Sequence, residues 1–339
     1  MSRILVSGLG AVSPAGWNLA AFRQAIEASH PLPIVPLARP GWDKPLRTRP
    51  VPPPATRPAF LAHPRLRRSS PITHYAASAA LEALAGRDMP KRVGLIFCLQ
   101  SGCVQYSYRF FEEALADPAT ASPLVFPETV FAAPASHVAA LLGNVPLVET
   151  LIGDPACFLQ GLALGADWLL QDRAEVCLVV GSEEINWLRA DALWHLEHAA
   201  IISGGAGVVA LGRDPALSIG VELSAITEAL SFSARQDRPQ AARAMRAELG
   251  AGVPGELLCD GLGDSPRADG PERTAWSDWT GPRLGLKRIF GEGLMAAAAW
   301  QCVAAADAVA AKRFPAAAVS LVGCNQQAIG ARFVPFQCH

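Results

Sequence analysis

The sequence has no long apolar run and almost no net charge. The formal net charge of the 339 residues is -1, which gives no electrostatic reason to expect binding to nucleic acid or to an anionic membrane. No apolar run approaches the ~18 residues that a membrane span needs. The first eight residues carry one positive charge and a short apolar run that ends at Gly8, which favours a first strand over a signal peptide. We therefore expect neither a membrane nor a nucleic-acid partner.

The cysteines do not form pairs. No CxxC motif is present, and no group of cysteines and histidines has the spacing of a zinc site. We therefore expect no metal, and reduced thiols in the cytoplasm, most of them small buried apolar side chains. The eight cysteines are Cys98, Cys103, Cys157, Cys177, Cys259, Cys302, Cys324 and Cys338.

The glycines near the N-terminus do not complete a dinucleotide-binding motif. Gly8 and Gly10 are two residues apart, but Ser13 stands where the third glycine would be, and no acidic residue for a ribose follows at the right distance. We predict a strand over residues 3–7, a glycine-rich turn over 8–16 and no bound cofactor.

The chain is long and apolar enough for two domains or one duplicated domain. Hydrophobic residues make up 51% of the sequence and charged residues 17%. Many of the prolines fall in residues 31–71, which predicts an extended surface loop. Arg65, Arg67 and Arg68 in that loop form a solvated face or a docking place for an acidic partner.

Predicted strands and helices alternate along the rest of the chain. Many strands are apolar on both faces, which is typical of buried, largely parallel sheets covered by helices. The order repeats after residue 215, so we predict two similar halves, residues 1–213 and 214–339, in a duplicated α/β/α/β/α layered fold. Strands are expected at 92–99, 147–152, 175–180, 207–211, 217–225, 257–260, 318–323 and 329–334; helices at 18–27, 72–85, 127–142 (with a turn), 157–170, 235–249 and 291–311.

Cys157 is the first candidate for chemistry. It follows the turn Gly153–Ala156, where a predicted strand gives way to a helix. The free N–H groups and the dipole at a helix N-terminus lower a thiol pKa and favour a nucleophilic thiolate. The other interpretation is a buried structural cysteine, and position alone does not separate the two.

Several segments, in order along the chain, resemble motifs of the β-ketoacyl synthase family, which has the thiolase fold. They are ILVSGLGAVSPAG (4–16), the helix that follows Arg67 and Arg68, FPETVFAAPASH (126–137), PAC (155–157), CLVVGSE (177–183) and SGGAGVV (203–209). The resemblance covers most of the chain and implies a thiolase-like fold with Cys157 at the nucleophile position. His137 falls on the helix of its segment and is interpreted as a packing residue. His195 and His198 are placed in a loop region and interpreted as structural.

The chain departs from the family at the two catalytic histidines. Asp260, in LCDGLG (258–263), stands at the first position, and Glu292, in KRIFGEGLMA (287–296), stands at the second. Lys287 is retained. Condensation with decarboxylation needs imidazole or amide groups to bind the malonyl carbonyl, and an ionised carboxylate repels the charge that develops there. The last family motif is also altered: GCNQQA (323–328) lacks the bulky aromatic gate residue.

Three functions follow from the resemblance. The first and favoured is a subunit similar to chain length factors, which pairs with an active ketosynthase in a type II polyketide or aryl polyene system and meets acyl carrier protein. The resemblance implies dimers through about Leu147 to Leu170, as a heterodimer or a homodimer, with Phe158 and Leu159 in the tunnel or the interface. The second is an acyltransferase or thioesterase that uses Cys157, with Asp260 or Glu292 as base and the Cys157 N–H in the oxyanion hole. The third, least favoured, is a condensing enzyme with rearranged residues.

Overall fold

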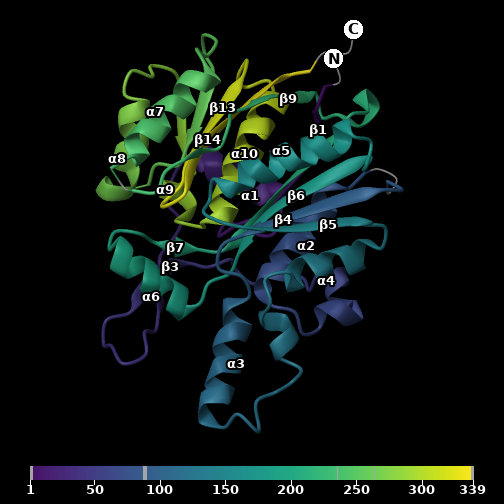
Figure 1. The fold of residues 1–339 in the computed structure, drawn as a ribbon, viewed down its shortest axis with the longest axis vertical. Coiled ribbons are helices and arrows are strands. Elements are labelled where there is room, and N and C mark those ends of the chain that lie inside the picture. The colour runs from purple at the N-terminus through teal and green to yellow at the C-terminus, as the bar shows by residue number, and fades with distance from the viewer. Residues whose placement is uncertain (1–2, 87–89, 235, 264, 337–339) are drawn as a thin grey trace.

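The computed structural model describes residues 3–86, 90–234, 236–263 and 265–336 (Figure 1). Its main strands are β1 (Leu5–Val12), β4 (Val93–Leu99), β5 (Leu147–Ile152), β6 (Val176–Glu183), β8 (Gly205–Gly212), β9 (Val221–Ile226), β11 (Leu257–Asp260), β12 (Arg283–Gly285), β13 (Ala317–Val322) and β14 (Gln327–Pro335). Its α-helices are α1 (Leu19–Ala28), α2 (Pro71–Ala83), α3 (Val104–Ala116), α4 (Ala133–Leu142), α5 (Cys157–Leu170), α6 (Trp187–Leu196), α7 (Arg238–Leu249), α8 (Pro266–Ala275), α9 (Leu286–Phe290) and α10 (Met295–Ala310). Shorter strands are β2 (Val35–Leu37), β3 (Leu46–Arg49), β7 (Ile202–Ser203) and β10 (Leu230–Ser231).

Ten of these strands follow one path in space, and the path has an internal repeat. The strand order is β12-β11-β13-β14-β9-β1-β8-β6-β4-β5. From β1 outward the pairs β1–β8 and β8–β6 are antiparallel, and β6–β4 and β4–β5 are parallel. From β9 outward the pairs β9–β14 and β14–β13 are antiparallel, and β13–β11 and β11–β12 are parallel. The two five-strand sets therefore have the same order and the same directions. The predicted boundary after residue 213 falls between β8 and β9, and the division into two units there stays a prediction.

Helices α5 and α10 contribute to the largest apolar core, between the two strand sets (Figure 1). Helix α10 is buried at every residue from Met295 to Val309. A Cβ on Gly181 of β6 or on Gly207 of β8 would stand 2.7 Å from the Ala299 Cβ. Because strands and helix approach this closely, only glycine on the strands and alanine on the helix fit. Helices α2 and α4 belong to a second core. Helices α7 and α8 pack on the five-strand set β9-β14-β13-β11-β12, called the β9–β12 half below.

The glycine-rich turn predicted over residues 8–16 is wrong in its first part. Strand β1 continues through Gly8 and Gly10 to Val12 and is buried along its whole length. A Cβ on Gly10 would stand 2.0 Å from the carbonyl oxygen of Ala79 on α2. The glycine therefore permits a close approach of helix to strand and does not reverse the chain.

The segment 31–71 is more ordered than a surface loop. Strands β2 and β3 pair with each other, and β3 pairs with β7. The side chain of Arg39 is buried, stacks between Trp42 and Trp194, and forms an ion pair with Asp191 of α6. His195, predicted in a loop, lies in the last turn of the same helix. Arginine–aromatic stacking thus fixes a segment whose proline content predicts a loop.

Residues 104–131, called the α3 arm below, project from the body of the molecule (Figure 1). No residue of α3 is buried. Large apolar side chains are exposed along the arm: Phe111, Leu115, Leu124, Phe126, Val130 and Phe131. Within the described residues, no helix combines the length and the apolar character that crossing a bilayer requires.

Candidate functional site

Cys157 is the first residue of α5, as predicted, and its thiol is covered. The residue is 5% exposed. Its peptide N–H donates to the Asp154 carbonyl oxygen (2.9 Å), and the Phe158 N–H donates to the Pro155 carbonyl oxygen (3.2 Å). The N–H predicted for an oxyanion hole is therefore already used within the turn. Phe158 and Leu159 are both 0% exposed, so in this chain they are core residues and not surface residues of an interface.

The prediction of a lowered thiol pKa is wrong. Burial raises the pKa of Cys157 to about 11, and the nearby Asp154 carboxylate adds to the rise. A helix N-terminus contributes roughly 1 kcal/mol or less at most exposed sites, and loss of solvation outweighs it here. Cys157 is therefore a neutral thiol at pH 7. Among the other cysteines, the buried ones are Cys98, Cys103, Cys177, Cys259 and Cys302, and Cys324 is exposed; Cys338 lies outside the described residues.

Asp154 connects the Cys157 turn to the turn between β13 and β14 (residues 323–326), called the β13–β14 turn below. Its Oδ2 accepts N–H bonds from Gln326 (3.0 Å) and Asn325 (3.5 Å), and its Oδ1 accepts the N–H of Ala156 (3.2 Å). In return, the Asp154 N–H donates to the Gln326 Oε1 (2.9 Å). Burial raises the pKa of Asp154, and these N–H groups oppose the rise. The β13–β14 turn therefore lies directly against the turn that precedes Cys157.

Asp260 lies at the end of β11 and is 2% exposed. Its Oδ2 is 3.4 Å from Nη1 of Arg283 on β12, and its Oδ1 accepts the Leu262 N–H (3.3 Å). Burial raises the pKa of Asp260. Glu272 of α8 is the second buried acid here: burial, and then the charge of Asp260, raise its pKa to about 7. Asp260, which the resemblance places at the first histidine position, is thus part of a buried acid pair on which the charges of Arg283 and Arg288 act.

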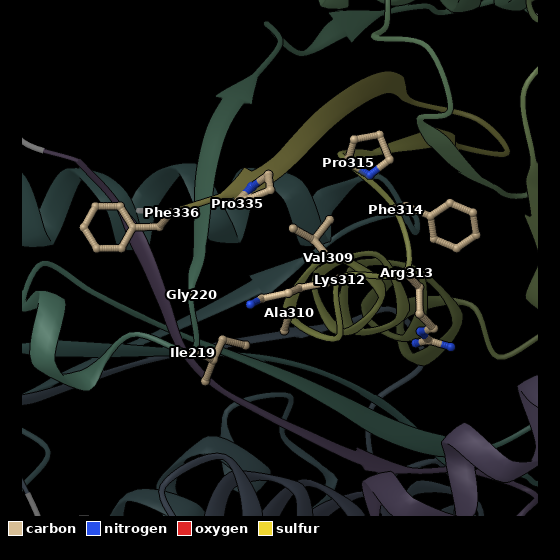
Figure 2. Close-up of a pocket in the computed structure, with 10 residues that line it drawn as sticks. All are labelled: Ile219, Gly220, Val309, Ala310, Lys312, Arg313, Phe314, Pro315, Pro335 and Phe336. Carbon is tan, nitrogen blue, oxygen red and sulfur yellow. The ribbon is translucent and has the colours of Figure 1, made fainter. Parts of the chain in front are cut away.

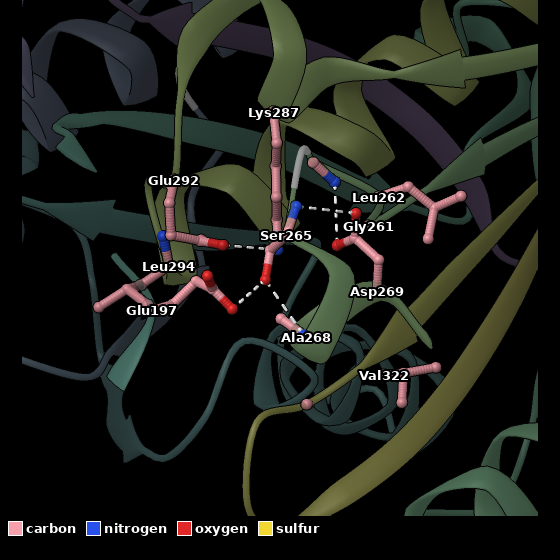
Figure 3. A network of polar contacts seen from close by, with 12 residues as sticks. Glu197, Gly261, Leu262, Ser265, Ala268, Asp269, Lys287, Glu292, Leu294 and Val322 are labelled. Carbon is pink, nitrogen blue, oxygen red and sulfur yellow. Dashed lines mark hydrogen bonds and ion pairs between the residues drawn. The ribbon is translucent and has the colours of Figure 1, made fainter. Parts of the chain in front are cut away.

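Lys287 and Glu292 form an ion pair across the end of α9 (Figure 3). The Nζ–Oε2 distance is 2.7 Å, and Glu292 Oε1 also accepts the Leu294 N–H (2.8 Å). Burial lowers the pKa of Lys287, but the carboxylates of Glu292, Glu272 and Asp269 together outweigh burial, and the pKa is raised. Lys287 therefore neutralises the Glu292 carboxylate.

A neighbouring polar group was not found from the sequence. Ser265 caps α8: its Oγ accepts the Ala268 N–H (3.1 Å) and donates to Glu197 (Figure 3). Asp269 accepts N–H bonds from Gly263 (3.1 Å) and Ser265 (3.3 Å). A serine followed by proline and, four residues on, by an aspartate is a helix-start signal that could have located α8.

The candidate residues fall into two groups. Cys157 is tied to Asp154 and the β13–β14 turn. In the second group, Asp260 pairs with Arg283, and Lys287 pairs with Glu292. The charge of Glu272 acts on both Lys287 and Asp260 and so connects the two pairs. Cys324 links the groups, because it interacts electrostatically with both Asp154 and Glu292. Among the described residues, no cluster of histidines, cysteines and acids is arranged to hold a metal ion.

His137 and one cavity complete the survey of candidates. His137 lies on α4 and is 7% exposed, with Nε2 2.9 Å from the Glu128 carboxylate. A cavity of about 710 Å³ lies beside the last turn of α10 and the end of β14 (Figure 2). Its described lining residues include Ile219, Lys312 and Phe336 but none of the predicted site residues.

The sequence matches no protein-family model and no curated protein. The fold, however, matches many solved structures. The ishigamide ketosynthase/chain length factor superposes with a TM-score of 0.82 at 14% identity, covering 99% of this chain and 100% of that one. A β-ketoacyl synthase from Burkholderia phymatum gives 0.82 at 17% identity with the same coverage. A type II polyketide acyl-carrier protein in complex with its ketosynthase bound to the hexaketide (AntDE:AntF) gives 0.79 at 16% identity, covering 99% and 100%. The predicted thiolase-like ketosynthase fold is therefore confirmed.

Proposed function

Starting from a ketosynthase-like fold, we propose that this chain is a non-condensing subunit, similar to a chain length factor, that pairs with an active ketosynthase acting on chains held by acyl carrier protein. The proposal rests on the pair of carboxylates, Asp260 and Glu292, at the two positions where the resemblance places the catalytic histidines. Asp260 and Glu292 are held by Arg283 and Lys287. Neither offers the neutral N–H donor that a malonyl carbonyl and the developing enolate need.

The state of Cys157 supports the same proposal. A condensing enzyme must first carry its acyl chain on this sulfur, which requires a thiolate and open access. Here the thiol is neutral at pH 7, 5% exposed and packed in the core. In this conformation the Cys157 thiol is therefore poorly suited to taking up an acyl chain.

Two exposed surfaces are suited to pairing. Strand β5 ends the sheet, so within the part of the chain that the structure describes no strand lies beside one of its edges, and its side chains Val148 and Ile152 are 42% and 55% exposed. Free strand edges invite pairing with another chain. The α3 arm adds Phe111 and Leu115, 62% and 86% exposed. Apolar surface of this kind marks a place where a partner binds.

A basic surface is suited to an acidic carrier protein. Arg65, Arg67 and Arg68 are all exposed. Three guanidinium groups within four residues attract an acidic partner and raise its association rate at low salt. Acyl carrier protein is the partner we propose for this surface.

A second function, a Cys157-dependent acyltransferase or thioesterase, has two observations in its favour. Cys157 lies at the N-terminus of α5, and burial raises the pKa of Asp260, which makes its carboxylate a stronger base. In that reaction the Cys157 sulfur would attack the thioester carbonyl, the carrier thiol would leave, and water or another acceptor would release the acyl group. It requires the thiol to be uncovered first.

Incubation with malonyl- and acyl-carrier-protein thioesters tests the proposal. We expect no carbon dioxide release and no condensed product above the carrier alone, and no adduct on the protein by intact-mass measurement. Condensation that disappears in Cys157→Ala, or carbon dioxide release above that of the carrier alone, would overturn the proposal. An acyl adduct lost in Cys157→Ala but kept in Cys324→Ser, without condensation, would establish the acyltransferase instead.

A further inference from the structure

The cavity of about 710 Å³ lies where the C-terminal end of α10 meets the end of β14 (Figure 2). Backbone hydrogen bonds hold its walls together: the Phe336 N–H, for example, donates to the Gly220 carbonyl oxygen (2.8 Å). Cavities of this size with a mostly apolar lining are those that take small molecules. The apolar lining residues are Ile219, Val309, Ala310, Phe314, Pro315, Pro335 and Phe336.

Lys312, which also lines the cavity, ends α10 in a conformation that favours glycine. Its φ is 56°, in the left-handed region. The Lys312 and Arg313 N–H groups donate to the carbonyl oxygens of Val309 (2.9 Å) and Ala308 (3.0 Å), which is a common hydrogen-bonded helix end. Glycine would make the same two bonds without the steric cost of a Cβ, so ending the helix does not by itself explain a lysine at position 312.

The Lys312 ammonium group is available to a ligand. The residue is exposed, and within the described residues its side chain has no ion pair or hydrogen bond. Asp307, the nearest acid on α10, is already shared by two arginines: its Oδ2 is 2.8 Å from Arg313 Nη2, and its Oδ1 accepts from Arg23 Nε (2.8 Å). In Figure 2 the Lys312 side chain extends across the opening towards Gly220. An apolar cavity thus has an unpaired cation at its opening.

We propose that this cavity binds a single-chain anionic amphiphile. The apolar chain packs against Ile219, Val309 and Phe336, and a carboxylate or phosphate head pairs with the Lys312 ammonium. Burial of the chain supplies most of the affinity, and the charged head supplies the selectivity. The site shares no lining residue with the Cys157 and Asp260 groups, so it stands whether or not the chain pairs with a ketosynthase.

Isothermal titration calorimetry of the full chain with octanoate, octyl phosphate and octan-1-ol tests the site. The alcohol has the same chain without a charge. We expect saturable binding of at least one anion and about tenfold weaker binding of the alcohol, because the alcohol lacks the charge-assisted hydrogen bond to lysine. The anion that binds more tightly identifies the head group. No saturable binding of either anion up to about 1 mM would overturn the proposal.

Lys312→Met keeps the length of the side chain and removes its charge. It should weaken binding of the anion about tenfold and leave that of octan-1-ol within about twofold, so the preference for an anion disappears. Lys44→Met changes an exposed lysine between β2 and β3 and is the matched control, which should alter neither affinity. A preference that survives in Lys312→Met, or that is lost equally in Lys44→Met, contradicts the role of Lys312.

A second pair of variants tests the cavity itself. Ala310→Phe fills it from a half-buried lining position, while Ala311→Phe places the same ring at the next, exposed residue, outside the lining. Ala310→Phe should remove binding of anion and alcohol alike, and Ala311→Phe should keep both. Equal binding by the two variants would place the ligand elsewhere on the protein and overturn the site.

Lys312→Gly separates loss of binding from loss of folding. Glycine suits the left-handed backbone at this position, so the variant should melt at or above the wild-type temperature. It should nevertheless lose the preference for an anion as Lys312→Met does. A folded Lys312→Gly variant that still prefers octanoate or octyl phosphate to octan-1-ol would rule out the proposed head-group contact.

Discussion

At the scale of single residues, the buried acids make the free energy of unfolding depend on pH. The pKa of Glu272 is raised from 4.5 to about 7 by burial and then by the Asp260 charge. Between these values the unfolded chain has released its proton and the folded chain has kept it. Stability from this group is therefore fully present below pH 4.5 and is lost as pH rises through about 7.

Glu272→Gln should reduce that dependence. We expect the wild-type protein to lose about 1–3 kcal/mol of unfolding free energy from this group between pH 4.5 and 7, and the variant to lose less. Urea unfolding at a series of pH values measures the slope. Glu27→Gln, on the exposed side of α1, is the control and should leave the slope unchanged. An unchanged slope in Glu272→Gln would contradict the buried, protonated state of this acid.

The sequence located Cys157 at a helix start but predicted the wrong direction for the shift of its pKa. A strand-to-helix turn can be recognised from periodicity, and α5 begins at the expected residue. The pKa of Cys157 is raised by burial and by the Asp154 carboxylate, and that carboxylate accepts the N–H of Gln326, which is 169 residues after Cys157 in the chain. No local pattern reports a contact of that kind. Lys287 and Glu292 are only five residues apart, so their ion pair is the contact of this site that sequence spacing comes closest to predicting.

At the scale of elements, α10 shows why its sequence is rich in alanine. The helix approaches β6 and β8 so closely that Gly181 and Gly207 face the Ala299 methyl group. Its hydrophobic residues do not lie on one face, because a helix buried on all sides needs no polar face. The sequence therefore predicted the helix, with a start at 291 that is four residues too early, but could not say which layer the helix occupies.

Ala299→Leu should destabilise the protein by about 1–3 kcal/mol or more, because the added carbons have no space between the helix and two strands. Thermal or urea unfolding measures the loss. Ala311→Leu, at the exposed end of the same helix, carries the same chemical change and should cost much less. Equal effects of the two variants would contradict the close packing of α10.

Elements with clear apolar runs were predicted well, and those fixed by polar contacts were missed. The predicted bounds of 147–152, 157–170 and 257–260 agree with β5, α5 and β11. Helices α3, α6, α8 and α9 were not predicted. Helix α3 has no buried residue, and α8 begins at a serine cap and contains a proline. The start predicted for α7, at Arg235, lies outside the described residues; α7 begins at Arg238.

At the scale of the whole molecule, the exposed arm and the free sheet edge predict association. The chain alone should self-associate as its concentration rises, because the apolar side chains of the α3 arm are uncovered. Phe111→Glu with Leu115→Glu should weaken this association at least tenfold. Analytical ultracentrifugation measures it.

Val253→Glu is the control for that experiment, since Val253 is 49% exposed but belongs to the β9–β12 half of the chain. It should leave association unchanged. A wild-type chain that stays monomeric at every concentration, or an arm variant that associates as strongly as wild type, would contradict the role of the arm.

The repeated strand order also determines when each half of the sheet can close while the chain is being made. In each five-strand set the last strand made is inserted beside the first: β8 lies between β1 and β6, and β14 lies between β9 and β13. A nascent chain that has made β13 still has a gap beside β9, with backbone groups unpaired on both sides. The second half can therefore close only after β14 has left the ribosome. Until then its open edges need protection from pairing with other chains.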